Sequence, residues 1–451
     1  IVGIQNQFAQ TKLPSILSDN MLLQQATDVK IWGWDTPGQS VTVNPSWTKS
    51  VKTITNKEGK WQVFVATPKA GKTGKLKISG STKQTIKNIL FGEVWLCSGQ
   101  SNMEMPVSGN KGQPINNSNL AILNSENSQL RFFKVKKNNS KTPLNSCEGN
   151  WKLAAPNSVK DFSATAYFYG KMLQEKLGVP VGLINSSWGG TPAEAWTPSE
   201  IIQTEFKDFK GWNKKTETPQ KNPSVLYNGM IHPLKPFTFK GVIWYQGESN
   251  KNYYQNYHQL FSSMIKSWRT AWNQGDFPFY FVQIAPLSWG GENQAYLREA
   301  QLKTMLSVPN TGMAVTLDIG EKECIHPAEK QKVGERLALW ALAKNYGFKD
   351  IQYSGPVYKE MNVKANKVTL TFDYAPFGVF NFGKKMDGFK VAGEDKVFYQ
   401  AEAKITKGKL EVWSDKVLKP VAVRYGWDAW VDGALFNTAK LPASSFRTDN
   451  W

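Results

Sequence analysis

Short runs in which apolar and polar residues alternate fill the first ninety positions of the chain. Turn-forming residues separate these runs, as Asp35-Thr-Pro-Gly38 does. Side chains of a strand point alternately to two faces, so this alternation predicts strands with one buried face. Several such strands at regular spacing indicate a β-sandwich. We expect strands at 29–34, 40–43, 61–65 and 76–78, and an N-terminal β-sandwich-like domain over residues 1–89.

The pattern changes at Glu93, where a continuous apolar run replaces the alternation. Runs of this kind are typical of strands that are buried on both faces of a sheet. Helical segments separate them, and this order predicts a parallel sheet with helices on both sides. We expect a three-layer α/β domain over residues 90–348, with strands at 93–97, 181–184, 241–245, 279–284 and 313–317 and helices at 164–177, 253–272, 295–306 and 330–345.

Two further segments complete the chain. Residues 108–150 are rich in Asn, Ser and Lys and poorly periodic, so we expect long loops there. Alternation returns after Phe348, with strands expected at 367–372, 409–413 and 420–425, which predicts a C-terminal β-rich domain over residues 349–451.

No stretch approaches 18 uninterrupted apolar residues, so we expect no membrane span.

The chain is strongly basic, because 55 Lys and Arg residues against 36 Asp and Glu residues give a formal net charge of +19. Such a charge is compatible with a polyanionic partner. Only six of the 55 basic residues are arginine, the residue whose planar fork recognises bases and phosphates. The lysines are also spread along the chain, so we expect a solvated lysine coat and no nucleic-acid partner.

Cysteine and histidine are both rare. Three cysteines allow at most one disulfide bond, and three histidines without a CxxC pair predict no metal site. We expect no cofactor. The chain begins Ile1-Val-Gly without a Met, which is compatible with a processed N-terminus and with export.

Residues able to support chemistry follow the predicted strands, where α/β folds place their ligands. The first strand leads into Gly99-Gln-Ser101, and a serine in such a turn can expose its hydroxyl as a nucleophile. A helix N-cap is the alternative role for Ser101. The second strand leads into 185–191, which contains a pair of glycines. The pair either lets backbone N–H groups approach a ligand or forms an ordinary tight turn. The third leads into 245–250, a cluster of amide and carboxylate side chains.

Three histidines are the candidates for a general base. His326 follows the last predicted strand of the α/β domain and precedes a helix, so we favour it. His258 lies inside a helical pattern and is expected to be a surface or packing residue. For His232 we favour a structural hydrogen bond.

Taken together, these blocks resemble the SGNH hydrolase superfamily and, within it, the sialate O-acetylesterase-like carbohydrate esterases. The order is a serine, a glycine, a Gln/Asn cluster and a histidine, each after its own strand. The resemblance covers nearly the whole chain and rests on 94–104, 184–191, 227–234, 241–250, 297–301 and 325–327 with 336–338, together with the early 17–23 and the terminal 441–447.

The resemblance implies a catalytic role for each block. Ser101 is expected to be the nucleophile and His326 the base that takes its proton. The oxyanion hole is expected to use the Ser101 N–H, the Gly190 (or Gly189) N–H and the Gln246 side-chain amide, with Asn250 as the alternative.

The third triad position departs from the superfamily, whose usual block is Asp-x-x-His. Glu323 stands three residues before His326. It either orients the imidazole or points away, in which case a backbone carbonyl near Cys324 holds the ring and a Ser-His dyad remains.

Several residues beside these blocks are candidates for substrate contact. Trp188 and Tyr227 could form sugar-stacking faces, whereas Trp244, inside a buried run, is expected to pack in the core. Arg298 either binds a substrate carboxylate or is a buried ion-pair partner. Cys97 and Cys324 flank catalytic blocks, so a disulfide between them is conceivable.

We therefore expect a secreted or periplasmic serine esterase that acts on an acetylated carbohydrate, with O-acetylated sialic acids implied by the resemblance. An acetylesterase for plant polysaccharides such as xylan or xyloglucan is the alternative. A non-catalytic carbohydrate-binding protein is a third hypothesis.

Overall fold

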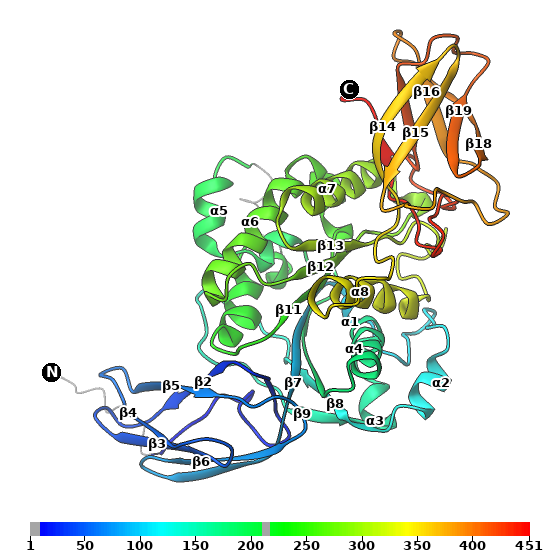
Figure 1. The fold of residues 1–451 in the computed structure, drawn as a ribbon. Coiled ribbons are helices and arrows are strands. Elements are labelled where there is room, and N and C mark those ends of the chain that lie inside the picture. Colours follow the sequence, from blue (N-terminus) through cyan, green and yellow to red (C-terminus); the bar gives the residue numbers. More distant parts are fainter. Residues whose placement is uncertain (1–9, 210–216) are drawn as a thin grey trace. The chain divides into compact units, whose positions relative to one another are not determined.

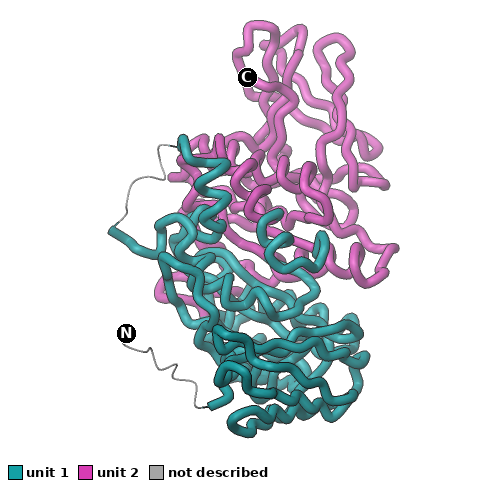
Figure 2. The backbone as a smooth tube through the Cα atoms, turned by 90° about the vertical axis from the view of Figure 1, so that its left-hand side faces the viewer, with its two compact units in different colours: residues 1–108, 117–243, 266–277 teal, residues 109–116, 244–265, 278–451 magenta. Residues whose placement is uncertain are grey.

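The structure, a computed structural model, describes residues 10–209 and 217–451. Its chain forms two compact units, each discontinuous in sequence (Figure 2). Unit 1 comprises residues 1–108, 117–243 and 266–277, and unit 2 comprises residues 109–116, 244–265 and 278–451. The first nine residues of the predicted N-terminal domain lie outside the described residues. The division into three domains, with boundaries after residues 89 and 348, stays a prediction.

The N-terminal part of unit 1 consists of β-strands, at the places that the alternation predicted. β2 pairs antiparallel with β5, while β3 pairs with β4 and β6. Buried and exposed residues alternate along β5 and β6, as expected for strands with one face in a core. The strands are β1 (Leu22–Gln24), β2 (Asp28–Trp34), β3 (Ser40–Pro45), β4 (Val51–Ile54), β5 (Lys60–Ala66) and β6 (Thr73–Ser79).

β7 (Lys83–Gly99) joins this β region to the sheet that carries the candidate site (Figure 1). Its first part pairs antiparallel with β6, and its last part pairs parallel with β10 (Val181–Ser187). The strand has 17 residues and passes through residue 89, where the sequence predicted a domain boundary. Its last nine residues are all buried, as a strand covered on both faces requires.

The sheet of unit 1 is mixed, whereas the sequence predicted a parallel one. Its order is β11-β7-β10-β8-β9, in which β8 runs parallel to β10 and β9 runs antiparallel to β8. The reason is the connection, because no helix lies between β8 and β9, and a parallel return requires a crossover. The remaining strands are β8 (Asn127–Lys134), β9 (Trp151–Ala154) and β11 (Gly241–Tyr245).

The helices of unit 1 begin and end at recognisable signals. α4 (Ala164–Leu177) has the predicted bounds, begins at the N-cap Ser163 and ends at Gly178, which has φ +64°. α2 (Ser118–Leu123) and β8 lie in the segment where we expected long loops, so that expectation was wrong for them, whereas residues 135–150 form a loop without helix or strand. The other short helices are α1 (Ser101–Glu104), α3 (Pro156–Val159) and α5 (Ser199–Glu205).

Unit 2 contains the parallel pair β12 (Phe279–Val282) and β13 (Thr311–Ala314). In Figure 1, α7 (Asn293–Ser307) and α8 (Lys330–Asn345) lie on opposite sides of these strands. The bounds of α8 are those predicted. α6 (Tyr254–Trp272) is divided between the two units at residue 265. None of the helices among the described residues is long and apolar enough to cross a membrane.

The C-terminal part of unit 2 is made of two four-stranded antiparallel sheets, as the returning alternation indicated. Their orders are β14-β15-β19-β18 and β17-β16-β20-β21. Tyr358 of the first sheet stacks on Phe446 of the second, with ring centroids 5.2 Å apart. The strands are β14 (Val357–Lys364), β15 (Lys367–Asp373), β16 (Phe389–Ala392), β17 (Phe398–Gln400), β18 (Glu402–Thr406), β19 (Lys409–Trp413), β20 (Ala422–Tyr425) and β21 (Phe446–Arg447).

Candidate active site

Ser101 begins α1 immediately after the turn that ends β7. Gly99 has φ +138° in this turn, a backbone conformation that residues with a side chain rarely adopt. The N-cap of α1 is Gln100, so the alternative role of Ser101 as an N-cap does not hold. Gln100 and Asn102 are buried, whereas Ser101 is half-buried. The turn therefore leaves the serine more accessible than its neighbours.

The glycine pair after β10 lies against this serine. A Cβ added to Gly189 would be 3.3 Å from the Ser101 Cβ, so the backbone at Gly189 lies close beside the serine and leaves little room for a side chain there. Gly190 has φ +71°, which favours glycine at this position. The Thr191 hydroxyl donates to the Trp188 carbonyl at 2.7 Å and closes the turn. The structure thus brings two of the predicted blocks together within unit 1.

Glu104 ties the two blocks to each other, and the sequence reasoning assigned it no role. Its carboxylate accepts a hydrogen bond from the Gly189 N–H at 2.6 Å and forms an ion pair with Lys137 at 2.5 Å. The Lys137 ammonium lies 5.5 Å from the centre of the half-buried Trp188 ring. Because the Gly189 N–H is engaged by Glu104, Gly190 is the member of the pair better suited to an oxyanion.

In unit 2, the amide cluster that follows β11 is held by its own hydrogen bonds. The Gln246 side-chain N–H donates to the Asn250 Oδ1 at 2.6 Å, and the Tyr257 hydroxyl donates to the Gln246 Oε1 at 2.9 Å. Both amide side chains are buried. Gln301 donates to the Gln246 carbonyl at 3.1 Å. These contacts fix the orientation of two candidate oxyanion donors.

His326 lies in the loop between β13 and α8, half-buried, beside a buried lysine. The Lys330 ammonium donates to the Pro327 carbonyl at 2.6 Å and is 1% exposed. Burial lowers the pKa of His326 below its ordinary value, and the Lys330 charge lowers it further. Burial also lowers the pKa of Lys330 to about 7, against the opposing effect of Glu248. The imidazole is therefore favoured in its neutral form, which a general base requires.

Glu323 is exposed and contacts a neighbouring loop. Its Oε1 accepts a hydrogen bond from the Ser288 hydroxyl at 3.0 Å. The Ser288 N–H donates to the Lys322 carbonyl at 2.9 Å, so two bonds join the segments. The Cys324 thiol donates to the His326 carbonyl at 3.4 Å. This arrangement favours the alternative in which Glu323 points away from the imidazole.

A pocket that the sequence reasoning missed lies beside this loop. It has a volume of about 180 Å³ and is lined by Trp289, Lys251, Gln294 and Cys324, among others. Trp289 is 55% exposed, and the Lys251 ammonium lies 5.2 Å from its ring centre. The Gln294 Oε1 is buried without a hydrogen-bond partner among the described residues. Trp289 follows Ser288, so the Glu323 contact also supports this wall of the pocket.

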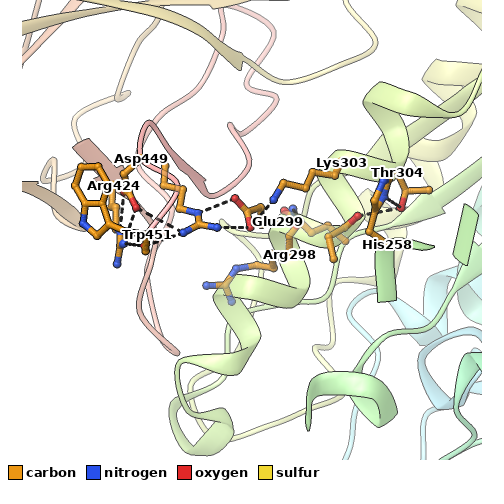
Figure 3. Close-up of polar contacts among 11 residues, drawn as sticks. His258, Arg298, Glu299, Lys303, Thr304, Arg424, Asp449 and Trp451 are labelled. Carbon is orange, nitrogen blue, oxygen red and sulfur yellow. Dashed lines mark hydrogen bonds and ion pairs between the residues drawn. The ribbon is translucent and has the colours of Figure 1, made fainter. Parts of the chain in front are cut away.

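Arg298 is fully buried, and its contacts are with the C-terminal part of unit 2. Its Nε donates to the Ser445 hydroxyl at 2.9 Å, and its Nη2 donates to the carbonyls of Gly426 and Asp428 at 2.9 and 2.7 Å. Burial lowers the pKa of Arg298 to about 10. These contacts match a buried structural role better than a substrate carboxylate site. Figure 3 shows α7 beside the segment that carries Arg424, Asp449 and Trp451.

The remaining histidines are engaged in packing contacts. The His232 Nδ1 lies 2.8 Å from the Leu144 carbonyl, which confirms the expected structural hydrogen bond. The His258 Nδ1 lies 3.2 Å from the Thr304 hydroxyl, between α6 and α7 (Figure 3).

The large aromatic residues near the blocks differ in exposure. Trp244 is fully buried and stacks on Phe261, which confirms its core role. Tyr227 is 7% exposed, and burial raises its pKa to about 12. Tyr227 therefore offers a substrate less surface than Trp188 does.

The cysteines and the acidic groups add no further centre. All three cysteines are free, so the conceivable disulfide between Cys97 and Cys324 is not formed. Across residues 10–209 and 217–451, no group of three or more His, Cys, Asp and Glu side chains is arranged to hold a metal ion.

Comparison with known proteins assigns the chain to a family. The model of a family described as carbohydrate esterase, sialic acid-specific acetylesterase, matches residues 91–343. Sialate O-acetylesterase of Rattus norvegicus is 31% identical over 439 residues, covering 82% of this chain and 79% of that protein. Sialate O-acetylesterase of Homo sapiens is 32% identical over 414 residues, covering 82% and 77%.

A solved structure agrees over almost the full length. The crystal structure of a carbohydrate acetylesterase from Xanthomonas citri is similar with a TM-score of 0.90 and 38% identity, covering 98% of this chain and 100% of that chain. The matched residues 91–343 contain each of the blocks from Ser101 to His326. The chain therefore belongs to the carbohydrate esterase family of sialic acid-specific acetylesterases and is a carboxylic ester hydrolase that deacetylates carbohydrates.

Proposed function

We propose that the chain is a serine esterase that hydrolyses O-acetyl esters of carbohydrates through an acetyl-enzyme intermediate. The Ser101 Oγ attacks the acetyl carbonyl while His326 takes its proton. His326 then gives this proton to the sugar oxygen that leaves. In the second half, His326 accepts a proton from water while the water oxygen attacks the acetyl carbonyl. The bond from this carbonyl to the Ser101 Oγ then breaks, His326 gives its proton to the Oγ, and acetate is released.

The oxyanion hole in this proposal uses the Ser101 N–H, the Gly190 N–H and the Gln246 side-chain amide. Asn250 is the alternative third donor. The engagement of the Gly189 N–H by Glu104 supports Gly190 within the glycine pair. Loss of one such donor typically costs about 10²–10³ in rate.

The position of the Gly189–Gly190 turn close beside Ser101 carries the proposal. A half-buried serine thus lies beside a glycine turn whose Gly190 N–H is the right chemistry for an oxyanion. Gly99 supports the same conclusion, because its φ of +138° belongs to the turn that leads from β7 into Ser101. The depressed pKa of His326 supports it as the base near neutral pH.

The third triad position belongs to Glu323 by sequence, but its contact with Ser288 favours a dyad. We therefore rest the chemistry on Ser101 and His326. The proposed fold is the three-layer SGNH type, flanked by N- and C-terminal β-sandwich-like regions, and the proposed location is secreted or periplasmic.

O-acetylated sialic acids are the proposed substrate, because the two curated relatives are sialate O-acetylesterases. Trp188 is the proposed sugar-stacking residue near Ser101, with Tyr227 contributing its edge. In unit 2, the exposed ring of Trp289 is a separate candidate for contact with a sugar.

Acetate release from 9-O-acetyl-N-acetylneuraminic acid, compared with acetylated xylan and acetylated xyloglucan, tests the proposal. We expect the fastest release from the sialic acid and none from the Ser101→Ala variant. Faster release from the plant glycans would show that these are the preferred substrates, and it would leave the proposed serine esterase mechanism unchanged. Inertness toward all three and toward 4-nitrophenyl acetate would contradict the chemistry itself.

The same assay decides the role of Glu323. We expect Glu323→Gln to retain turnover within about threefold of the wild type, because the Gln oxygen can still accept the exposed hydrogen bond from the Ser288 hydroxyl. A loss of several orders of magnitude would restore Glu323 as the orienting acid.

A further inference from the structure

A larger pocket lies in the N-terminal β region, within unit 1. Its volume is about 480 Å³, in the range of small-molecule sites. None of the residues given a catalytic role above lines it. The pocket is formed by β2, β4, β5 and the segment around His232, and its lining is Trp32, Gly33, Trp34, Thr53, Ile54, Asn56, Lys60, Trp61, Gln62, Asn145, His232, Lys235 and Pro236.

The pairing of β2 with β5 places two tryptophans on one face of this wall. Trp32 is opposite Gln62, and Trp34 is opposite Lys60. Side chains directly opposite one another share a face, and residues two apart on a strand do too. Trp32, Trp34, Lys60 and Gln62 therefore lie together, on the face opposite to the buried Ile31 and Val63 of the sandwich core.

The wall of the pocket that faces these strands, at 232–236, is held in place by packing and by a hydrogen bond. Trp32 packs edge-on against Phe237, with ring centroids 6.5 Å apart. The hydrogen bond between the His232 Nδ1 and the Leu144 carbonyl joins this wall to the strip that carries Asn145. The pocket is therefore preformed, and a ligand would not have to order its walls.

The lining combines aromatic rings with positive charge and contains no carboxylate. Lys60 and Lys235 supply the ammonium groups, and both act on His232, whose pKa burial lowers. Asn56, Gln62 and Asn145 supply amide donors and acceptors.

This chemistry suits a sugar that carries a carboxylate. The apolar faces of pyranose rings pack on tryptophan, hydroxyl groups bond to amides, and a carboxylate pairs with ammonium groups. We propose that the pocket binds an acidic glycan segment, separately from the site of hydrolysis. The carbohydrate class follows from the family, and binding here does not depend on the catalytic roles proposed above.

Isothermal titration calorimetry of the full chain with 6′-sialyllactose and with lactose tests the pocket. We expect the wild type to bind sialyllactose more tightly than lactose. Trp34→Ala should weaken binding of both by about tenfold or more, since it removes a stacking face. Lys235→Gln should remove most of the preference for the acidic sugar, together with its dependence on salt.

Lys77→Gln is the matched control, because Lys77 is an exposed lysine of β6 outside the pocket lining and should leave both affinities unchanged. The proposal is overturned if the wild type binds neither sugar, or if Trp34→Ala and Lys235→Gln bind as the wild type does. Hydrolysis of 4-nitrophenyl acetate should be unchanged in all three variants. If Trp34→Ala lost this activity as well as its affinity for sugars, the loss of affinity would be due to misfolding. That outcome would also overturn the proposal.

If the wild type hydrolyses neither the three acetylated carbohydrates nor 4-nitrophenyl acetate, the catalytic proposal fails, while the binding results with the two sugars still decide the pocket. The two proposals therefore fail on different measurements.

Discussion

The carboxylate of Glu104 accepts a hydrogen bond from the Gly189 N–H across 85 positions of sequence. This bond ties the short helix that begins at Ser101 to the turn that contains Gly190. It adds to the hydrogen bond from the Trp188 N–H to the Gly99 carbonyl, at 3.1 Å, in holding the turn beside the serine. Glu104 is therefore a positioning residue for the proposed oxyanion hole.

Replacing Glu104 tests this relationship. Glu104→Ala should lower kcat by about ten- to a hundredfold, since a hydrogen bond to a charged group is worth about 1.5–3 kcal/mol. KM should change little, because substrate contacts are retained. Glu104→Gln keeps an acceptor and should lose less.

The control for Glu104 is Glu148→Gln, which removes an exposed ion pair with Lys136. It should leave kcat unchanged. A rise in KM as large as the fall in kcat for Glu104→Ala would contradict the positioning role. A fall in kcat for Glu148→Gln would contradict it too.

Lys330 should determine the acid limb of the pH–rate profile. Its charge lowers the pKa of His326, so the imidazole stays neutral and active below its ordinary pKa. Lys330→Met removes that charge, and the limb of kcat/KM should move to higher pH. Lys332→Met, at an exposed lysine of the same helix, should leave the limb in place. A shift of the limb to lower pH in Lys330→Met would contradict this sign.

Trp289 should affect carbohydrate substrates selectively. Its exposed ring borders the pocket beside Cys324, so Trp289→Ala should raise KM for an acetylated sugar by about tenfold. Turnover of 4-nitrophenyl acetate, which has no sugar to stack, should not change. Trp47→Ala would be a poor control, because the Trp47 Nε1 donates to the Ala66 carbonyl. Tyr253→Ala, at an exposed aromatic residue outside the pocket lining, is the better one. Equal effects on both esters would show that Trp289 acts on the fold.

Arg298 should matter for stability and not for sugar specificity. Arg298→Met removes the donor of the Asp428 carbonyl and of the Ser445 hydroxyl oxygen, while the Gly426 carbonyl still accepts from the Ser445 hydroxyl at 2.8 Å. Each acceptor that loses its donor costs about 1–3 kcal/mol, so we expect the free energy of unfolding in urea to fall by at least about 2 kcal/mol. Lys303→Met, which removes an exposed ion pair with Glu299, should cost less than about 1 kcal/mol. A stable Arg298→Met variant with a raised KM for sialic acids alone would instead favour a substrate role.

Regular elements and reactive blocks could be predicted from the sequence because their signals are local. The Ser163 cap and the Gly178 end define α4 within a few positions, and the 3.6-residue period defines α8. β8 was missed because its exposed start, Asn127-Ser-Gln129, resembles the polar loop before it. Glu323 was assigned a triad role from its position before His326, and Glu104 was overlooked because nothing in its position indicated a role. Their actual partners, Gly189 and Ser288, are set by the fold and leave no mark in the sequence.

The 17-residue strand β7 also bears on how such a chain can evolve. Its N-terminal half completes the sheet of the β region, and its C-terminal half leads into Ser101. Recombination between genes at residue 89 would cut a continuous strand and leave unpaired edges on both pieces. The β region and the strand that leads into Ser101 are therefore expected to fold as one piece, so exchange of the β region at residue 89 should disturb the candidate site, whereas substitutions within it need not.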